Sequence, residues 1–129
     1  MKIFTAALCA ALLLARSGLA AEMSVETMPY PGAVALLQDR PGIWGYKSFP
    51  SFLPLYVFDG EPAGQSTCDK VCSEVWPIIR ADERASPMGL WTIVLRPDGR
   101  KQWAYKGKPV YTYFEDKAND PRGVGKDQD

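Results

Sequence analysis

The sequence predicts a mainly β fold: a small antiparallel domain built from two related aromatic hairpins plus one short helix. Turn-forming residues are frequent, with 11 Gly and 11 Pro in 129 residues, and this favours short strands over a helical bundle. Residues 90–114 contain apolar runs separated by tight turns, and an aromatic motif occurs in two places. Because the connections are short, we expect antiparallel pairing, in either a barrel or a sandwich.

The clearest strands lie in residues 90–114. LWTIVLR (90–96) is followed by PDG (97–99), in which Pro presets the backbone angle of a turn and Gly accepts a positive φ. KQWAYK (101–106) is the returning strand, and PVYTYF (109–114) is the third. The segment therefore predicts a meander.

The first half of the chain gives weaker signals. The apolar run at 33–38 fits a strand or one helical turn, and PLYVF (54–58) fits a strand. A short helix is expected to begin at Ser66, which can cap it, with Asp69 three residues later as in a capping box. Pro77 limits this helix at its C-terminal end.

Residues 1–20 are predicted to be a secretory signal peptide. A positive charge at Lys2 precedes an apolar run at 3–14, and small residues complete the segment. The run is too short to span a bilayer, and the alternative is a buried N-terminal helix. Cys9 lies inside the apolar run, so we expect it to leave with the signal rather than to carry a lipid anchor.

Cleavage after residue 20 would leave 109 of the 129 residues. We expect a lead-in segment over 21–41 and a repeat domain over 42–129, with the copies at about 42–61 and 101–116. The mature part has 13 basic and 15 acidic residues, a net charge of about −2, which gives no electrostatic reason to bind nucleic acid. It contains no second apolar run long enough to be transmembrane. The expected location is the periplasm or the outside of the cell.

Each repeat copy begins with an aromatic pair, since WGYK at 44–47 matches WAYK at 103–106. In a strand, the Trp and the Tyr of each pair share one face. The candidate aromatic surface consists of Trp44, Tyr46, Trp103 and Tyr105. Aromatic side chains of this set that are exposed would be able to bind a partner or a sugar ring. The alternative is that these side chains belong to the core.

A second motif follows in each copy, since PLYVF at 54–58 matches PVYTY at 109–113. An acidic residue lies five positions after the first tyrosine of each copy. The motif residues are Tyr56, Phe58, Glu61, Tyr111, Tyr113 and Asp116. In a structural interpretation the tyrosine hydroxyl bonds the carboxylate and fixes a turn, because a buried hydroxyl needs a partner. In a functional interpretation, the tyrosine and the acid form a binding site for a ligand or a metal ion.

These motifs resemble a bacterial family of secreted repeats, predicted lipoproteins with a Tyr-x-aromatic-x-x-Asp motif and no established function. The resemblance rests on PLYVFDGE (54–61), on the cysteine pair with its following Trp-Pro, and on DGRKQWAYKGKP (98–109). It covers roughly residues 42–125, with Glu61 in place of the family's Asp in the first copy. Family members continue into a Trp-His strand, so the resemblance implies that a C-terminal sheet edge is missing beyond Asp129.

Cys68 and Cys72 are expected to form a disulfide, the usual state of a close cysteine pair outside the cytoplasm. In a helix their Cα atoms would lie about 6 Å apart, within the range for a disulfide. C-x-x-x-C also occurs in copper sites, but those sites require His, and this chain has none. The C-x-x-C redox motif and the C-x-x-C-H haem motif are absent.

The sequence assigns no catalytic residue, cofactor or metal. Without His there is no Ser-His or Cys-His pair and no His-based zinc site, and no phosphate-binding glycine motif is present. We therefore expect a non-enzymatic structural or binding module of the cell envelope, whose partner is an envelope protein or a small ligand. The alternative is a periplasmic redox or metal-handling accessory protein that uses Cys68 and Cys72.

Overall fold

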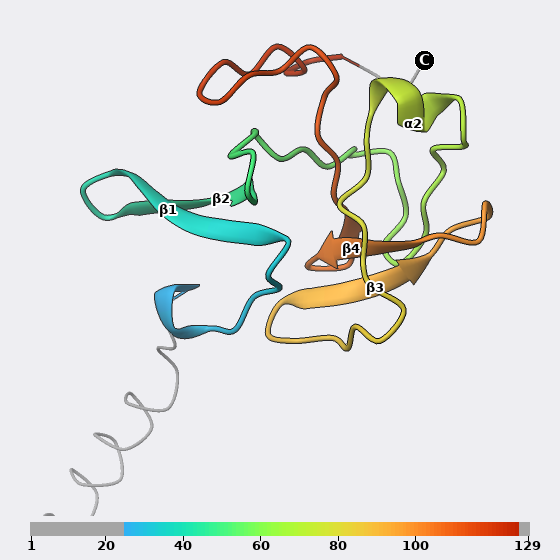
Figure 1. Cartoon of the computed structure of the whole chain (residues 1–129), viewed down its shortest axis with the longest axis horizontal. Helices are drawn as coiled ribbons and strands as arrows, with labels where there is room; N and C mark the ends of the chain where they lie inside the picture. The colour runs from blue at the N-terminus through green and yellow to red at the C-terminus, as the bar shows by residue number, and fades with distance from the viewer. Residues whose placement is uncertain (1–24, 127–129) are drawn as a thin grey trace, which may run out of the picture.

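The computed structural model describes residues 25–126 (Figure 1). The expected signal peptide, including Cys9, lies outside the described residues. The regular elements are the 3-10 helix η1 (Val25–Thr27), β1 (Val34–Arg40), β2 (Ile43–Ser48), α2 (Cys72–Val75), β3 (Trp91–Leu95), β4 (Lys101–Tyr105) and β5 (Lys108–Pro109). Over the described residues, no helix is long and apolar enough to cross a membrane.

The strands form two antiparallel sheets. β1 pairs with β2, and β3, β4 and β5 follow one another in the second sheet. Val34 lies opposite Ser48 in the first sheet, and Trp91 lies opposite Tyr105 in the second. Figure 1 shows the β1–β2 hairpin extending to one side of the β3–β4 sheet. The mainly β, antiparallel fold with one short α-helix is therefore confirmed.

Residues 90–114 form the expected meander, but its third strand is much shorter than predicted. β5 covers only Lys108–Pro109. Beyond it the chain makes single-residue bridges, in which Tyr111 pairs with both Tyr56 and Ile78. The strand ends early because the backbone groups of Tyr111 bond to the first half of the chain instead of to β4.

The first half of the chain contains a hairpin that the sequence only partly indicates. Residues 34–38 of the run at 33–38 are strand rather than a helical turn, because they belong to β1 and pair with β2. β1 thus lies within the segment 21–41 that is expected to be a lead-in. PLYVF (54–58) is not a regular strand, since it pairs only through isolated bridges at its first and third residues. Each half of the chain therefore consists of a hairpin followed by an extended aromatic segment.

The α-helix begins later than predicted, since α2 covers only Cys72–Val75. Asp69 Oδ1 accepts the first backbone N–H of this helix at 2.8 Å. Ser66 does not cap it, because its hydroxyl bonds the Tyr111 hydroxyl at 2.8 Å and the Arg96 guanidinium at 3.0 Å. Ser66 is thus part of the buried core.

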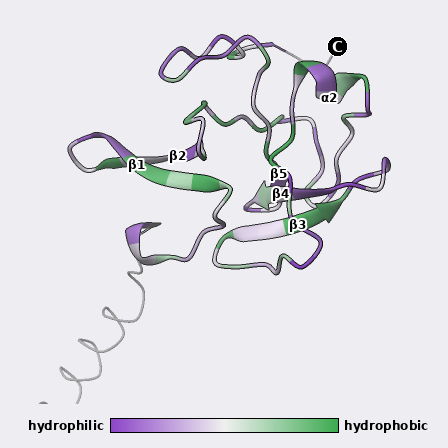
Figure 2. Ribbon diagram, viewed as in Figure 1, coloured by the Kyte–Doolittle hydropathy of each residue, from purple (hydrophilic) through white to green (hydrophobic). Residues whose placement is uncertain are grey.

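Buried apolar residues form two clusters. The first joins the two sheets and contains Val34, Ile79, Ala81, Trp91, Trp103 and Val110. The second contains Cys68, Trp76, Tyr111 and Tyr113. Figure 2 shows apolar residues along β1 and at one end of β3, whereas β4 is largely hydrophilic. Gln102 of β4 is nonetheless fully buried, because its side chain donates to the Val110 carbonyl and accepts from Arg96.

Candidate functional site

Tyr56 and Tyr111, the first tyrosines of the two motif copies, meet backbone to backbone. Tyr56 N donates to Tyr111 O at 2.8 Å, and Tyr111 N donates to Tyr56 O at 2.9 Å. The pair is antiparallel, so the two aromatic segments pass each other in opposite directions. The copies are therefore arranged about this pair with approximate two-fold symmetry.

The motif side chains are exchanged between the copies. The Tyr56 hydroxyl donates to Asp116 Oδ2 at 2.6 Å, and the Tyr111 hydroxyl donates to Glu61 Oε2 at 2.8 Å. Each tyrosine thus bonds the acid that follows the other tyrosine in sequence. The repeat predicts a bond between tyrosine and acid, but it does not predict that the bond links the two copies.

Each motif acid also closes the loop that follows it. Glu61 Oε2 accepts from Thr67 N at 2.7 Å, and Asp116 Oδ1 accepts from Arg122 N at 2.6 Å. In both copies the donor lies six residues beyond the acid. The two loops therefore share one local design, although the first uses Glu and the second uses Asp.

The first tyrosine of each motif copy, Tyr56 or Tyr111, is held as a neutral phenol. Burial raises the pKa of Tyr111 to about 12; its bond with Ser66 opposes this rise, and its bond to Glu61 adds to it. Burial likewise raises the pKa of Tyr56 to about 12, and the bond to Asp116 acts in the same direction. At neutral pH each hydroxyl therefore remains a hydrogen-bond donor to its carboxylate.

Trp76 joins the second aromatic residues of the two copies. Its ring centre lies 4.8 Å from that of Phe58 and 4.7 Å from that of Tyr113, and the residue is 1% exposed. A Cβ on Gly123 would lie 3.0 Å from the Trp76 ring and 2.9 Å from Tyr113 Cβ, so only Gly allows the chain to cross here. Trp76 has no counterpart in the repeat, so the repeat does not predict its contacts with both copies.

A buried arginine connects the motif to the cysteine loop. Arg96 is 2% exposed, and its guanidinium donates to the Ser66 hydroxyl, to Gln102 Oε1 at 2.7 Å and to the Cys68 carbonyl at 2.6 Å. Its Nε forms an ion pair with Asp98 at 3.1 Å. Arg96 ends the predicted strand 90–96 and offers no sequence signal of its link to the cysteine loop, because Ser66 and Cys68 lie far away along the chain.

The expected disulfide between Cys68 and Cys72 is present, with their Cα atoms 5.3 Å apart. Cys68 is buried in the second core cluster, where Cys72 packs against it from a half-buried position. Only Cys72 belongs to α2, so the disulfide joins the helix to the preceding loop. Across residues 25–126, no group of three or more His, Cys, Asp or Glu is placed to hold a metal ion.

The candidate aromatic surface is divided between surface and core. Trp44 is 40% exposed, whereas Trp103 is only 4% exposed and belongs to the first core cluster, so it is not a surface residue. Tyr46 and Tyr105 are half-buried and contact each other with ring centres 5.4 Å apart. These two tyrosines provide a second contact between the copies.

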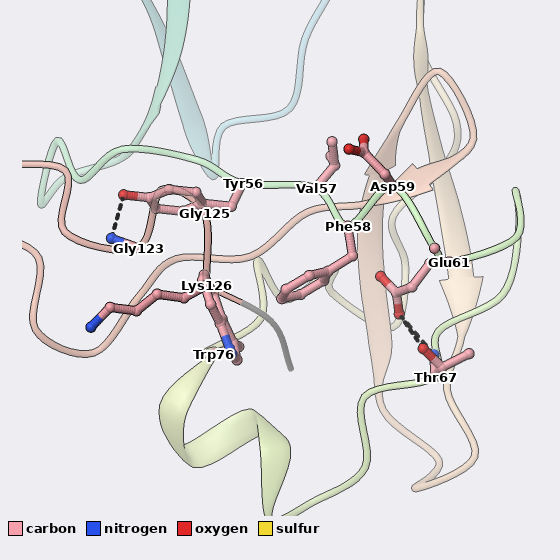
Figure 3. Close-up of a pocket in the computed structure, with 11 residues that line it drawn as sticks. Tyr56, Val57, Phe58, Asp59, Glu61, Thr67, Trp76, Gly123, Gly125 and Lys126 are labelled. Carbon is pink, nitrogen blue, oxygen red and sulfur yellow. Dashed lines mark hydrogen bonds between the residues drawn. The ribbon is translucent and has the colours of Figure 1, made fainter. Parts of the chain in front are cut away.

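A cleft of about 450 Å³ opens beside the motif (Figure 3). It is lined by residues 56–61 on one side, by Gly123, Gly125 and Lys126 on the other, and by Thr67 and Trp76. It contains the complete motif of the first copy, but Tyr111, Tyr113 and Asp116 of the second copy do not line it. Asp59, Thr67 and Lys126 are lining residues that the repeat does not indicate.

Glu61 brings an unsatisfied acceptor to this cleft. The residue is 2% exposed, and its donors, Thr67 N, Thr67 Oγ1 and the Tyr111 hydroxyl, all bond Oε2. Oε1 is buried and has no hydrogen-bond partner in the described part of the chain. In Figure 3 this oxygen points away from Thr67. Asp116 differs, because its two oxygens bond Tyr56 and Arg122 separately.

The fold and the site define a two-copy β-repeat protein. Residues 92–128 match the model of a family described as a secreted repeat of unknown function. The match covers β3 from its second residue, β4, β5 and the second copy of the motif, and over these residues it confirms the family resemblance. No curated protein and no solved structure matches the chain. The first copy lies outside the match but has the same hairpin, aromatic segment and acid loop.

Proposed function

We propose that this protein is a non-enzymatic binding module of the cell envelope, located in the periplasm or outside the cell. In this proposal the two repeat copies form a rigid frame, and the cleft beside Phe58 is the binding site. The observation that carries the proposal is the exchange of hydrogen bonds between the copies, from Tyr56 to Asp116 and from Tyr111 to Glu61.

The exchanged bonds support a framework role for the motif. Both tyrosine hydroxyls are engaged with carboxylates, and both have a raised pKa, so neither is poised to act as a nucleophile or a general base at neutral pH. Groups fixed in this way provide a preorganised site, which lowers the entropic cost of binding a ligand. The cleft next to them is of a size typical for small-molecule sites.

Export is supported by independent features. The signal-like residues 1–20 and the secreted character of the matched family agree with each other. The disulfide between Cys68 and Cys72 is the form that an oxidising compartment favours.

The test is to block the cleft without disturbing the frame. A Cβ at Gly60, which lines the cleft, would meet no atom within 4 Å, and the same holds at Gly32, which lies outside it. Gly60→Trp should therefore fill the cleft, and Gly32→Trp is the matched control. The chain without residues 1–20 is titrated with amino acids, short peptides, lipid-headgroup analogues and oligosaccharides, and its amide NMR shifts are followed.

The proposal expects at least one compound to shift the amides of residues 56–61 saturably. Gly60→Trp should abolish this response and Gly32→Trp should retain it. If no compound shifts these amides, or if Gly60→Trp leaves the response unchanged, the cleft is not the binding site and the proposal is wrong.

A further inference from the structure

We propose that the cleft binds a primary alkylammonium ion, with its ammonium group on Glu61 and its apolar stem against Tyr56 and Phe58. This inference rests on the proposed binding function of the cleft and specifies the ligand. Three features carry it: the unpartnered oxygen of a buried carboxylate, the aromatic wall, and the charge of the lining.

The first feature is the carboxylate of Glu61. A buried carboxylate is costly unless it is paired with a cation or fully hydrogen-bonded. Glu61 has donors only on Oε2, and none of the ion pairs within residues 25–126 includes it. The nearby Lys108 ammonium donates to the backbone carbonyls of Asp59 and Glu61 instead. An N–H donor with a positive charge is therefore the group that best completes this site.

The second feature is the aromatic wall. Tyr56 and Phe58 are half-buried lining residues, and both pack on Trp76, with ring centres 5.5 Å and 4.8 Å away. Aromatic faces attract cations and also cover apolar methylene groups. An alkylammonium ion supplies both a charge and a stem.

The third feature is the charge of the lining. Among the described lining residues, Asp59 and Glu61 contribute two carboxylates and Lys126 contributes one ammonium, which is a net charge of −1. Lys126 is already engaged elsewhere, because its Nζ bonds the Tyr113 hydroxyl at 3.0 Å and lies 5.0 Å from the centre of that ring. The remaining negative charge suits a single cation.

The unpartnered oxygen of Glu61 also predicts which kind of cation binds more tightly. Oε1 of Glu61 needs a hydrogen-bond donor, and a primary ammonium has three N–H groups, whereas a quaternary ammonium has none. An alcohol has a donor but no charge. Butylammonium, tetramethylammonium and 1-butanol therefore separate the contributions of the hydrogen bond, the charge and the stem.

The experiment titrates the chain without residues 1–20 with these three compounds and follows the amide shifts of Glu61 and Thr67. Butylammonium should bind at least about tenfold more tightly than either of the others, because a charge-assisted hydrogen bond is about twice as strong as a neutral one. Glu61→Gln keeps one carbonyl oxygen for Thr67 and Tyr111 but removes the charge, so it should weaken butylammonium binding about tenfold or more.

Glu83→Gln is the matched control, because Glu83 is an exposed acid in an ion pair with Lys101 and does not line the cleft. It should change stability little and leave butylammonium affinity within about twofold of the unmodified chain. If Glu61→Gln does not fold, Gly60→Trp replaces it and should block butylammonium.

Equal binding of tetramethylammonium or 1-butanol would overturn the inference, as would full retention of butylammonium binding in both Glu61→Gln and Gly60→Trp. An equal loss in Glu83→Gln would also overturn it, because the effect would then not come from the carboxylate in the cleft. If butylammonium fails but another compound occupies the cleft and is blocked by Gly60→Trp, the binding function stands and only the ligand class is wrong.

Discussion

Tyr56 and Tyr111 form a reciprocal backbone pair, in which the N–H of each donates to the carbonyl of the other at 2.8 and 2.9 Å. Their hydroxyls then reach in opposite directions, Tyr56 to Asp116 and Tyr111 to Glu61. Because each copy supplies a tyrosine to the other copy's acid, neither copy completes its own hydrogen bonds. The two halves of the chain therefore stabilise each other.

Removing the Tyr111 hydroxyl should destabilise the protein. Tyr111→Phe deletes the bond to Glu61 and the bond with Ser66 at a residue that is 0% exposed. We expect the free energy of unfolding to fall by about 1–3 kcal/mol, because buried polar partners are left unsatisfied. Denaturant unfolding measures this loss. Tyr30→Phe, at an exposed residue, is the control and should change stability little. No loss in Tyr111→Phe would contradict a structural role for the motif.

Adding a methyl group at Gly123 should disturb the packing around Trp76. A Cβ there would lie 2.9 Å from Tyr113 Cβ, which is too close for unstrained contact. Gly123→Ala should cost about 1–3 kcal/mol of stability, the usual range for overpacking a core. Gly60→Ala is the control, because its Cβ would have no atom within 4 Å. Equal thermal midpoints for the two variants would show that the crossing at Gly123 is not tightly packed.

Reduction of the disulfide should lower stability moderately. Closing so short a loop stabilises the fold by about 2 kcal/mol in the chain-entropy description. Cys72→Ser should therefore lower the thermal midpoint, and excess reductant should lower that of the unmodified chain but not that of the variant.

Measurements on the same two cysteines test the alternative role in redox or metal handling. A structural disulfide should have a reduction potential below about −300 mV and should resist reduction by the glutathione pool. A higher potential, or stoichiometric binding of Cu(I) by the reduced pair, would favour that alternative instead.

The strands and the disulfide could be predicted from the sequence because they rest on local signals. Alternation and turn residues locate β3 and β4, and the spacing of the cysteines indicates their bond. The equivalent residues Trp44 and Trp103 differ in burial, and alternation within a strand does not predict this difference. Trp103 packs in the first core cluster with Trp91 and Val110, whereas Trp44 lies near the tip of the β1–β2 hairpin, which extends to one side of the β3–β4 sheet. What packs against the face of each strand therefore decides which copy of the aromatic pair is buried.

The candidate site could be predicted only in part for a related reason. The repeat predicts that a tyrosine bonds an acid, but the acid belongs to the other copy because the segments run antiparallel past each other. Arg96 and Trp76 join segments that are distant in sequence. A single sequence carries no local pattern for such contacts.

Alkaline pH should unfold the protein through its motif tyrosines. Burial raises the pKa of Tyr56 and of Tyr111 from 10.0 to about 12. In the unfolded chain both phenols ionise near pH 10, so between pH 10 and 12 the folded state holds more protons than the unfolded state. The stabilising contribution is therefore fully present below pH 10 and is lost as the pH rises through 12.

The measurement is denaturant unfolding at intervals from pH 8 to 12, together with tyrosinate absorbance. The contribution of these two tyrosines to the free energy of unfolding should be nearly constant up to pH 10 and should then fall. Tyr111→Phe removes one of them, so the variant should start from a lower stability but lose less of it over this range. A slope above pH 10 that is the same in both proteins would mean that Tyr111 is not held as a neutral donor to Glu61. The interpretation of the exchanged bonds as the frame of the cleft would then have to rest on Tyr56 and Asp116 alone.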